Sequence, residues 1–372
     1  MDVSPVPDGP LAQAIAPALM LRGAGAWQEA RPSIATLLRR PLLLGRSPAT
    51  AGIRDHLTED LLSDGLQVTA AELRFDCCEE DLGRLAEQIS TAGCDGVIAV
   101  GGGKVLDAGK LLADRLDLPC VTVPTSAATC AGWTALANVY SPEGAFRHDR
   151  ALRRCPELLV FDHDLVRQAP ARTLVSGVAD AMAKWYEASV ASGCTSDGLV
   201  QQAVQMARVL RDQLLLEAAS ALADPGGEAW VRVAEGCALS AGVIGGIGGS
   251  RCRTVAAHAV HNGLTQLMAS HGCLHGEKVG FGILVQLRLE EMLAGSGLAG
   301  QARRQLVPFF QQLGLPVQLA DLGLADASLR DLEEVVRFAC LPESDLHQLP
   351  FAVSPSQLLA ALVSTTAELQ PA

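Results

Sequence analysis

The sequence is poor in aromatic and basic residues. Aromatic residues make up only 4% of the 372 positions, and the 49% hydrophobic content comes mostly from alanine, leucine and valine, which suits packed helices. The 29 lysines and arginines are outnumbered by 41 aspartates and glutamates, which gives a net charge of −12. This balance argues against a protein that coats nucleic acid or anionic lipid, because both need a positive surface. We expect a protein with a large core, no nucleic-acid partner and no membrane partner.

Long hydrophobic runs and cysteine motifs are also missing. No stretch approaches 18 uninterrupted apolar residues, and the first ten residues lack a basic region followed by an apolar run. We therefore expect neither a transmembrane helix nor a signal peptide. The eleven cysteines are odd in number and show no CxxC spacing. They are interpreted as reduced thiols, mostly small core residues, of a cytoplasmic protein.

The first half of the chain alternates strand-like and helix-like patterns. Short apolar runs predict strands at 41–44, 67–75, 96–100, 120–123 and 158–161, and apolar residues at helical spacing predict helices at 51–62, 79–92 and 104–116. This alternation indicates a parallel sheet with helices on its faces. We assign residues 1–162 to an α/β domain.

The second half is richer in long alanine- and leucine-containing segments. Glycine or proline interrupts them at 193, 224–227, 245–249 and 314–316. Residues 163–372 are therefore predicted to form an all-α domain. The segment 147–154 holds four arginines but is short, and we interpret it as a solvated turn.

Three glycines, Gly101, Gly102 and Gly103, follow a predicted strand and open a helix. Glycine permits close approach of the backbone to a phosphate and a positive φ, and the helix start supplies free N–H groups. Lys104 could add a charge, and Asp107 could orient the loop or accept a ribose hydroxyl. The run is not GxGxxG, and a tight strand-to-helix turn is the alternative interpretation.

The end of the first predicted strand bears on the choice of nucleotide. Many NAD proteins place an acidic residue there, whereas this chain has Gly45 and Arg46. Gly45 would leave room for a 2′-phosphate and Arg46 could pair with it, so a preference for NADP(H) is predicted. An ordinary surface arginine is the alternative.

Potential metal ligands gather in the second half. Asp180 lies in an apolar helical stretch with Lys184 one turn later, and His258 and His261 have i,i+3 spacing ahead of His275. One aspartate, two histidines and an open position suit Zn²⁺ or Fe²⁺. Buried histidines paired with backbone groups are the alternative.

Five segments together resemble the iron-containing, or group III metal-dependent, alcohol dehydrogenases, in particular their glycerol-dehydrogenase-like branch. They are GGGKVLDAGK at 101–110, VPTSAATCAGWTAL at 123–136, GVADAMAKWYEA at 177–188, AAHAVHNGLT at 256–265 and HGEKVGFG at 275–282. The resemblance implies a dinucleotide-binding α/β domain over residues 1–162 and a helical metal- and substrate-binding domain over residues 163–372. It also implies an active site in the cleft between them. It also implies a dimer or octamer.

The same resemblance implies roles for individual residues. By motif, Asp180, His258 and His275 would be the metal ligands, and His261 would position or protonate the substrate. Residues expected to contact NADP or NAD are Gly101, Gly102, Gly103, Lys104, Asp107, Thr125, Thr134, Leu136 and Tyr140. The implied reaction is hydride transfer assisted by one divalent metal, Zn or Fe.

Two departures bear on the substrate. Glycerol dehydrogenases carry an aspartate that contacts the polyol where this chain has Cys130, and some branches carry a histidine ligand where it has Lys184. We hypothesise that Lys184 binds a substrate carboxylate; a lysine that extends out of the helix or pairs with Glu187 is the alternative. The chain looks like a bacterial hydroxycarboxylate dehydrogenase that reduces 2-oxo acids with NADPH. A glycerol dehydrogenase, a dehydroquinate synthase-like lyase and a non-catalytic NAD-binding protein remain alternatives.

Overall fold

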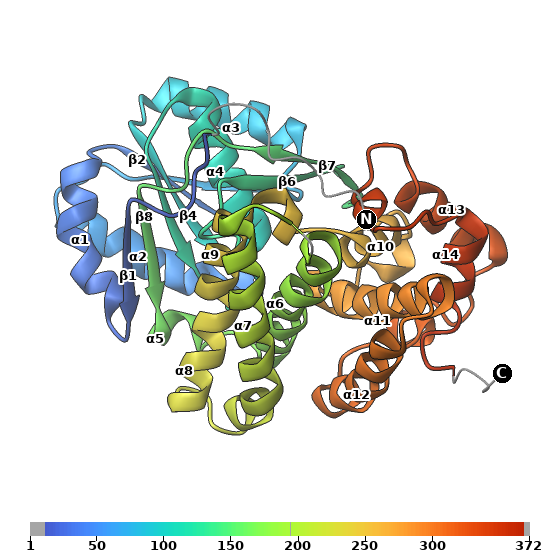
Figure 1. The fold of residues 1–372 in the computed structure, drawn as a ribbon. Coiled ribbons are helices and arrows are strands. Elements are labelled where there is room, and N and C mark those ends of the chain that lie inside the picture. The colour runs from blue at the N-terminus through green and yellow to red at the C-terminus, as the bar shows by residue number, and fades with distance from the viewer. Residues whose placement is uncertain (1–11, 194, 368–372) are drawn as a thin grey trace. The chain divides into compact units, whose positions relative to one another are not determined.

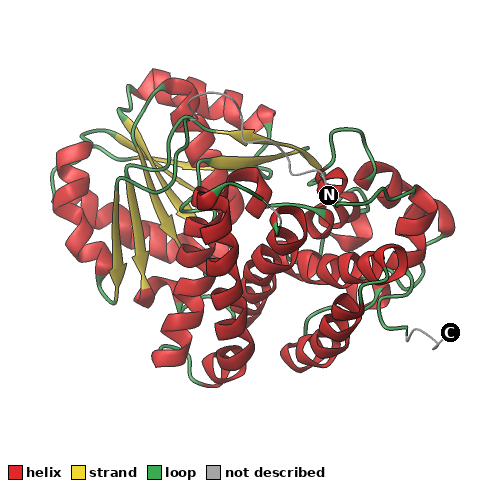
Figure 2. Ribbon diagram, in the orientation of Figure 1, coloured by secondary structure: helices red, strands yellow, loops and turns green. Residues whose placement is uncertain are grey.

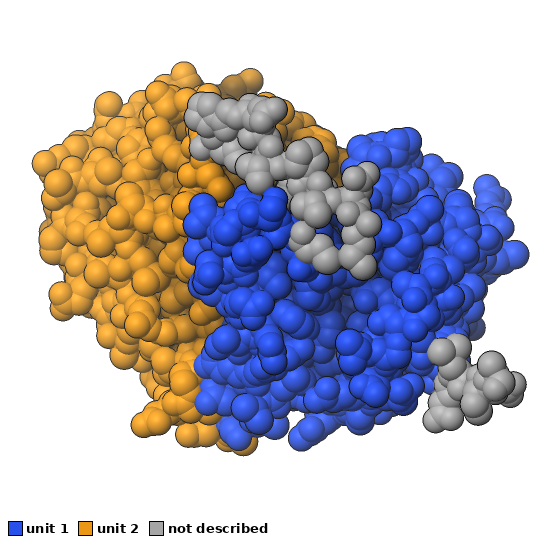
Figure 3. All heavy atoms as spheres, in the orientation of Figure 1, with its two compact units in different colours: residues 1–11, 175–220, 247–372 blue, residues 12–174, 221–246 orange. Residues whose placement is uncertain are grey.

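The computed structural model describes residues 12–193 and 195–367, in two compact units. The sheet unit comprises residues 12–174 and 221–246, and the described part of the helical unit comprises 175–220 and 247–367 (Figure 3). Figure 2 shows that the strands belong to the first of these units, whereas the second is built of helices. The fold is thus a parallel α/β sheet followed by an all-helical C-terminal region.

A six-stranded sheet forms the centre of the sheet unit (Figure 1). Its strand order is β1 (Leu19–Gly23), β8 (Leu158–Asp162), β5 (Cys120–Pro124), β4 (Gly96–Gly101), β2 (Pro41–Gly45) and β3 (Thr69–Glu72). All neighbouring strands are parallel. The carboxyl ends of β2, β4 and β5 therefore lie along one edge, which is where open α/β sheets bind ligands.

Alternating side chains of these strands face two different hydrophobic layers. Leu43 and Ile98 pack with α1 (Ala26–Leu37) and α2 (Ala51–Ser63). Leu42, Leu44 and Val97 pack on the opposite face with α3 (Glu79–Ala92) and α4 (Gly103–Leu116). Both faces are covered, which explains why these strands read as continuous apolar runs.

The five predicted strands and three predicted helices of this half are present, within a few residues of their expected ends. The sequence analysis missed β1, α1 and an antiparallel hairpin of β6 (Leu136–Tyr140) and β7 (Phe146–Ala151). The arginine-rich segment 147–154 lies largely in the strand β7, so the expectation of a turn was wrong. The strand is almost entirely exposed, as expected for a solvated segment.

The remaining helices are α5 (His163–Val166), α6 (Ala171–Ser192), α7 (Gly198–Ala223), α8 (Glu228–Glu235), α9 (Ala241–Gly248), α10 (Ala256–Leu264), α11 (His275–Ala294), α12 (Gly297–Leu313), α13 (Leu329–Ala339) and α14 (Pro355–Leu362). Four of them, α6, α7, α9 and α12, end at the predicted glycine or proline positions. In the helical unit, α10 and α11 enclose an apolar core with α13 and α14.

The helical stretch Glu228–Gly248 is long and apolar enough on average to cross a membrane. In the most apolar 18-residue window of this stretch, 61% is buried inside the protein, as in a core helix of a globular domain. Eight of the ten described cysteines are buried as well, in keeping with their interpretation as small core residues, and Cys194 lies outside the described residues. Burial raises the pKa of the Cys120 thiol to about 12, so this thiol stays protonated near neutral pH.

Candidate active site

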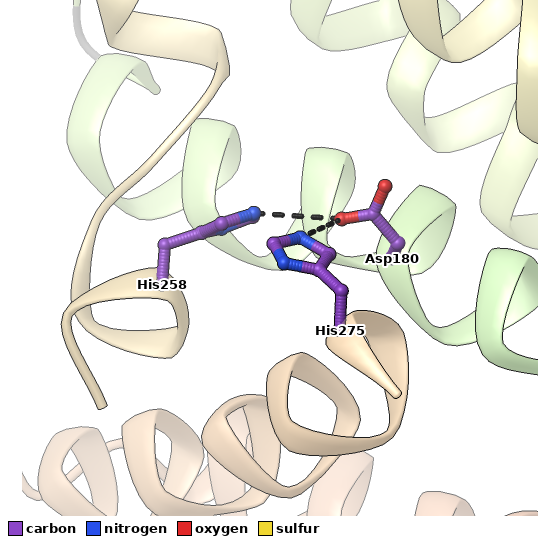
Figure 4. A group of neighbouring side chains, drawn as sticks. All are labelled: Asp180, His258 and His275. Carbon is purple, nitrogen blue, oxygen red and sulfur yellow. Dashed lines mark hydrogen bonds and ion pairs between the residues drawn. The ribbon is translucent and has the colours of Figure 1, made fainter. Parts of the chain in front are cut away.

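Three helices of the helical unit bring Asp180, His258 and His275 together (Figure 4). Asp180 lies in the middle of α6, His258 in the first turn of α10, and His275 is the first residue of α11. One donor atom from each lies within 4.8 Å of the others. The predicted convergence of these residues is therefore present in the structure.

The donor spacing fits a small divalent cation. Asp180 Oδ1 lies 3.4 Å from His258 Nε2 and 3.3 Å from His275 Nε2. Two ligands that each lie about 2.1 Å from a tetrahedral ion are about 3.4 Å apart. One carboxylate and two imidazoles leave a fourth position for substrate, as in catalytic zinc sites. The donor set and its spacing thus suit a bound metal.

Electrostatic interactions favour the charged form of the aspartate. Burial would raise the pKa of Asp180, but hydrogen bonds to His258 and His275 outweigh burial and hold the pKa well below its usual range. Burial would likewise lower the pKa of His258. The negative charge of Glu187 and the hydrogen bonds of His258 to Asp180 and Glu187 outweigh burial and raise this pKa to about 9. Binding of a metal at neutral pH would therefore release a proton.

His261 lies beside these donors. Its ring centroid is 4.2 Å from that of His275, and only 2% of the residue is exposed. Burial, followed by the positive charges of His275 and Lys278, lowers the pKa of His261 well below its usual value. Its Nδ1 lies 2.9 Å from the Asn262 side-chain oxygen, which leaves Nε2 of the neutral ring as a proton acceptor.

Lys184 is buried on α6, one turn after Asp180, and its residue is 5% exposed. Its ammonium donates to the Arg253 carbonyl over 3.4 Å. The charge of Lys184 contributes to lowering the pKa of Asp180 and opposes protonation of His258. A buried lysine cation therefore accompanies the metal donors.

The sequence analysis assigned Glu187 only as an alternative partner of Lys184. In the structure it is completely buried, and its carboxylate accepts hydrogen bonds from His258 Nδ1 and from the backbone N–H groups of Val255 and His258. Its position seven residues after Asp180 on a helix was the available signal, because this spacing places both carboxylates on one face.

The glycines after β4 occupy the expected strand-to-helix junction of the sheet unit. Gly101 ends β4, Gly102 is the N-cap of α4 and Gly103 is its first residue. None has a positive φ. Side chains there would clash instead, because a Cβ at Gly103 would lie 2.8 Å from Thr129 and one at Gly101 2.9 Å from Val105. Glycine is needed for close packing.

Charged residues cluster at the carboxyl ends of β2 and β4. The buried Asp76 carboxylate pairs with Lys104, and its Oδ1 lies 2.5 Å from Arg46. A Cβ at Gly45 would lie 2.1 Å from Arg54 Cδ, so the space beside Gly45 is filled by an arginine that pairs with Glu72. Gly45 thus makes room for an arginine side chain, where the sequence analysis expected space for a phosphate.

The other predicted nucleotide-binding residues surround the start of α4. Asp107 pairs with Lys110 and accepts from the Asn138 backbone N–H over 3.1 Å, so it orients this region. Lys110 in turn donates to Thr134 and to the Leu136 carbonyl. Two further positions lie nearby: the Lys104 ammonium is 5.0 Å from the Tyr140 ring centroid, and the Thr125 backbone N–H donates to the Gly101 carbonyl. Cys130, which the sequence analysis considered in relation to the substrate, is buried.

The model of the family described as iron-containing alcohol dehydrogenase matches residues 17–163. Hydroxycarboxylate dehydrogenase A of Escherichia coli is 36% identical over 77% of this chain and 79% of its own length. The chain belongs to the iron-containing alcohol dehydrogenase family. An uncharacterized oxidoreductase of Synechocystis sp. is 51% identical over 99% of this chain and 95% of its own length.

A solved structure described as a probable glycerol dehydrogenase from Sinorhizobium meliloti superposes with a TM-score of 0.84. It is 29% identical and is matched over 96% of this chain and 98% of that chain. These relatives place the chain in the glycerol-dehydrogenase-like branch of the iron-containing alcohol dehydrogenases. It is an NAD(P)-dependent, metal-containing dehydrogenase of alcohol and carbonyl groups.

Proposed function

We propose that this dehydrogenase reduces small 2-oxo acids to 2-hydroxy acids with NADPH. The observation that carries this proposal is the buried ammonium of Lys184, one helical turn from Asp180. A divalent cation and Lys184 would together carry three positive charges, one more than the two negative charges of Asp180 and Glu187 can balance. A substrate carboxylate would neutralise that excess, whereas a neutral polyol would leave it uncompensated.

Position 130 supports the same substrate class. Cys130 is buried and offers no carboxylate. A hydrogen-bond acceptor for polyol hydroxyls is therefore missing where glycerol dehydrogenases carry an aspartate. The 36% identity to a protein named hydroxycarboxylate dehydrogenase agrees with this interpretation.

The preference for NADP(H) rests on the positive side chains at the ends of β2 and β4. Arg46, Arg54 and Lys104 outnumber the carboxylates Asp76 and Glu72 that pair with them. A 2′-phosphate can form charge-assisted hydrogen bonds with guanidinium groups. We propose Gly101–Gly103 and the residues around α4 as the remainder of the nucleotide site.

The chain's own residues would bind the substrate and handle the proton. Asp180, His258 and His275 would hold the metal, which polarises the substrate carbonyl, and the nicotinamide supplies the hydride. Lys184 would orient the substrate through its carboxylate. In the reduction the substrate oxygen gains a proton as well as the hydride. His261, neutral and buried, would accept this proton from a water molecule at Nε2 and pass it on to the substrate oxygen. We further propose a cytoplasmic homo-oligomer without membrane or nucleic-acid partners.

A substrate panel tests the proposal. We would measure kcat/KM for 2-oxobutanoate, 2-oxoglutarate, dihydroxyacetone and glycerol, each with the matching NAD(H) and NADP(H) forms, using protein loaded separately with Zn²⁺ and Fe²⁺. NADPH with a 2-oxo acid should give the highest value. NAD-linked glycerol oxidation that far exceeds 2-oxo acid reduction would refute the proposal and support the glycerol dehydrogenase named for the S. meliloti structure.

A further inference from the structure

Among the residues that the structure describes, only Glu187 has a carboxylate that contacts the second ring nitrogen of a proposed metal ligand, the nitrogen that would not bind the metal. Its Oε2 lies 2.6 Å from His258 Nδ1, while its Oε1 accepts the backbone N–H of Val255 over 2.6 Å and that of His258 over 3.0 Å. The residue is completely buried. All three donors lie at the start of α10 or just before it.

We infer that Glu187 is a positioning residue that prepares His258 for the metal. An anion acts only as an acceptor, so His258 Nδ1 must carry the ring hydrogen. Metal binding releases the second ring proton, so the lone pair is then left on Nε2, the atom that lies 3.4 Å from Asp180 Oδ1. The two backbone hydrogen bonds hold the start of α10, so that ring orientation and backbone position are set by one carboxylate. The inference rests on the proposed metal site.

A glutamine at this position would reverse that arrangement. Its single amide oxygen can keep the two backbone hydrogen bonds only if its NH₂ group faces His258 Nδ1. Nδ1 must then accept, and the ring hydrogen moves to Nε2, where it blocks the metal. Loss of such an outer carboxylate generally costs 10–100-fold in metal affinity.

Gln286 provides a matched control. It is also completely buried and lies beside the same helix, where its side-chain oxygen accepts from the Ala257 backbone N–H over 3.3 Å and its amide donates to the Tyr186 carbonyl over 2.8 Å. The volume-conserving change Gln286→Met removes these bonds without altering a contact to the His258 ring. It should lower thermal stability while leaving metal affinity within a few-fold of wild type.

The experiment measures Zn²⁺ dissociation constants of the full-length protein by competition with a chromophoric chelator. It also records the absorption spectrum of the Co²⁺-loaded protein. Glu187→Gln should weaken Zn²⁺ binding about 10–100-fold and shift the Co²⁺ spectrum. Both Glu187→Gln and Gln286→Met should lower the melting temperature of the metal-free protein, so Zn²⁺ affinity is the measurement that separates them.

Equal Zn²⁺ affinity in Glu187→Gln and wild type would overturn the positioning role alone. An equal loss in Gln286→Met would also overturn it, because the effect would then follow from general weakening of α10. Failure of wild-type protein to bind one divalent cation would overturn both this inference and the proposed function.

Discussion

Lys184 adds a positive charge beside the proposed metal site of Asp180, His258 and His275. Replacing it with methionine keeps the apolar part of the side chain and removes the charge. Lys184→Met should raise KM for 2-oxobutanoate about 10–100-fold, because a hydrogen bond between charged groups contributes about 1.5–3 kcal/mol. Steady-state kinetics with dihydroxyacetone provide the control, since that substrate has no carboxylate. An unchanged KM for 2-oxo acids would remove the assigned role of Lys184.

Glu290 is a half-buried carboxyl group on α11. Burial, opposed by a hydrogen bond from Gln286, raises its pKa to about 7. The folded state therefore binds more protons than the unfolded state between about pH 4.5 and 7, and this residue lowers the free energy of unfolding as pH rises through that range. Glu290→Gln should remove this fall in the free energy of unfolding with rising pH.

We expect Glu290→Gln to stabilise the protein by about 1–3 kcal/mol more at pH 8 than at pH 5, measured by urea unfolding of the metal-loaded protein. The neighbouring Glu291 gives the contrast, because its carboxylate is buried and pairs with Arg288 and Arg303. Glu291→Gln should destabilise at both pH values by about 3 kcal/mol. If Glu290→Gln changed the free energy of unfolding equally at pH 5 and pH 8, Glu290 would not have a raised pKa in the folded protein.

At the scale of helices, the metal donors depend on close backbone contact between α6 and α11. A Cβ at Gly276 would lie 1.8 Å from the Ser176 carbonyl oxygen, and the Gly276 N–H donates to Ser176 Oγ over 3.0 Å. Gly276 adjoins His275, and Ser176 precedes Asp180 by one turn. Glycine at this position therefore sets the distance between two donors.

Gly276→Ala should force the two helices apart, lower the free energy of unfolding by about 1–3 kcal/mol and weaken Zn²⁺ binding. Gly272→Ala, in the loop before α11, is the matched control, because a Cβ there meets nothing within 4 Å and its φ is not positive. Thermal melts and chelator competition would compare the two variants. Equal behaviour of both would show that the α6–α11 contact does not control the metal site.

Element boundaries were predictable to different extents. The strands β2, β4, β5 and β8 are fully buried, and the continuous apolar runs that result can be recognised in a sequence. The edge strand β1 alternates irregularly between exposed and half-buried residues, and β7 is almost entirely exposed. Strands without a buried face leave no periodic pattern, which is why these two were missed.

At the scale of the whole molecule, all three metal donors belong to the helical unit, although Asp180 and His275 are 95 residues apart. Bound metal should therefore stabilise α6, α10 and α11. At one hundred times its dissociation constant, a ligand adds about 2.7 kcal/mol to the free energy of unfolding.

Removal of metal with a chelator should increase hydrogen exchange in α6, α10 and α11, while the strands β4 and β5 of the sheet unit keep their protection. Mass spectrometry of the exchanged protein would measure this, and Asp180→Asn should show no metal-dependent difference. A uniform change across both units would indicate that the metal acts on the whole fold and not through these three helices.

The sequence by itself determined the parallel sheet and four of the breaks between helices, because burial produces a periodic apolar pattern in strands and helices. Its motifs, through the family resemblance, singled out Asp180, His258 and His275 as candidate metal donors. Only the tertiary structure showed that Arg54 fills the space beside Gly45 and that Glu187 fixes the ring of His258. Those contacts join residues far apart in the chain, and local periodicity carries no information about which distant side chains meet.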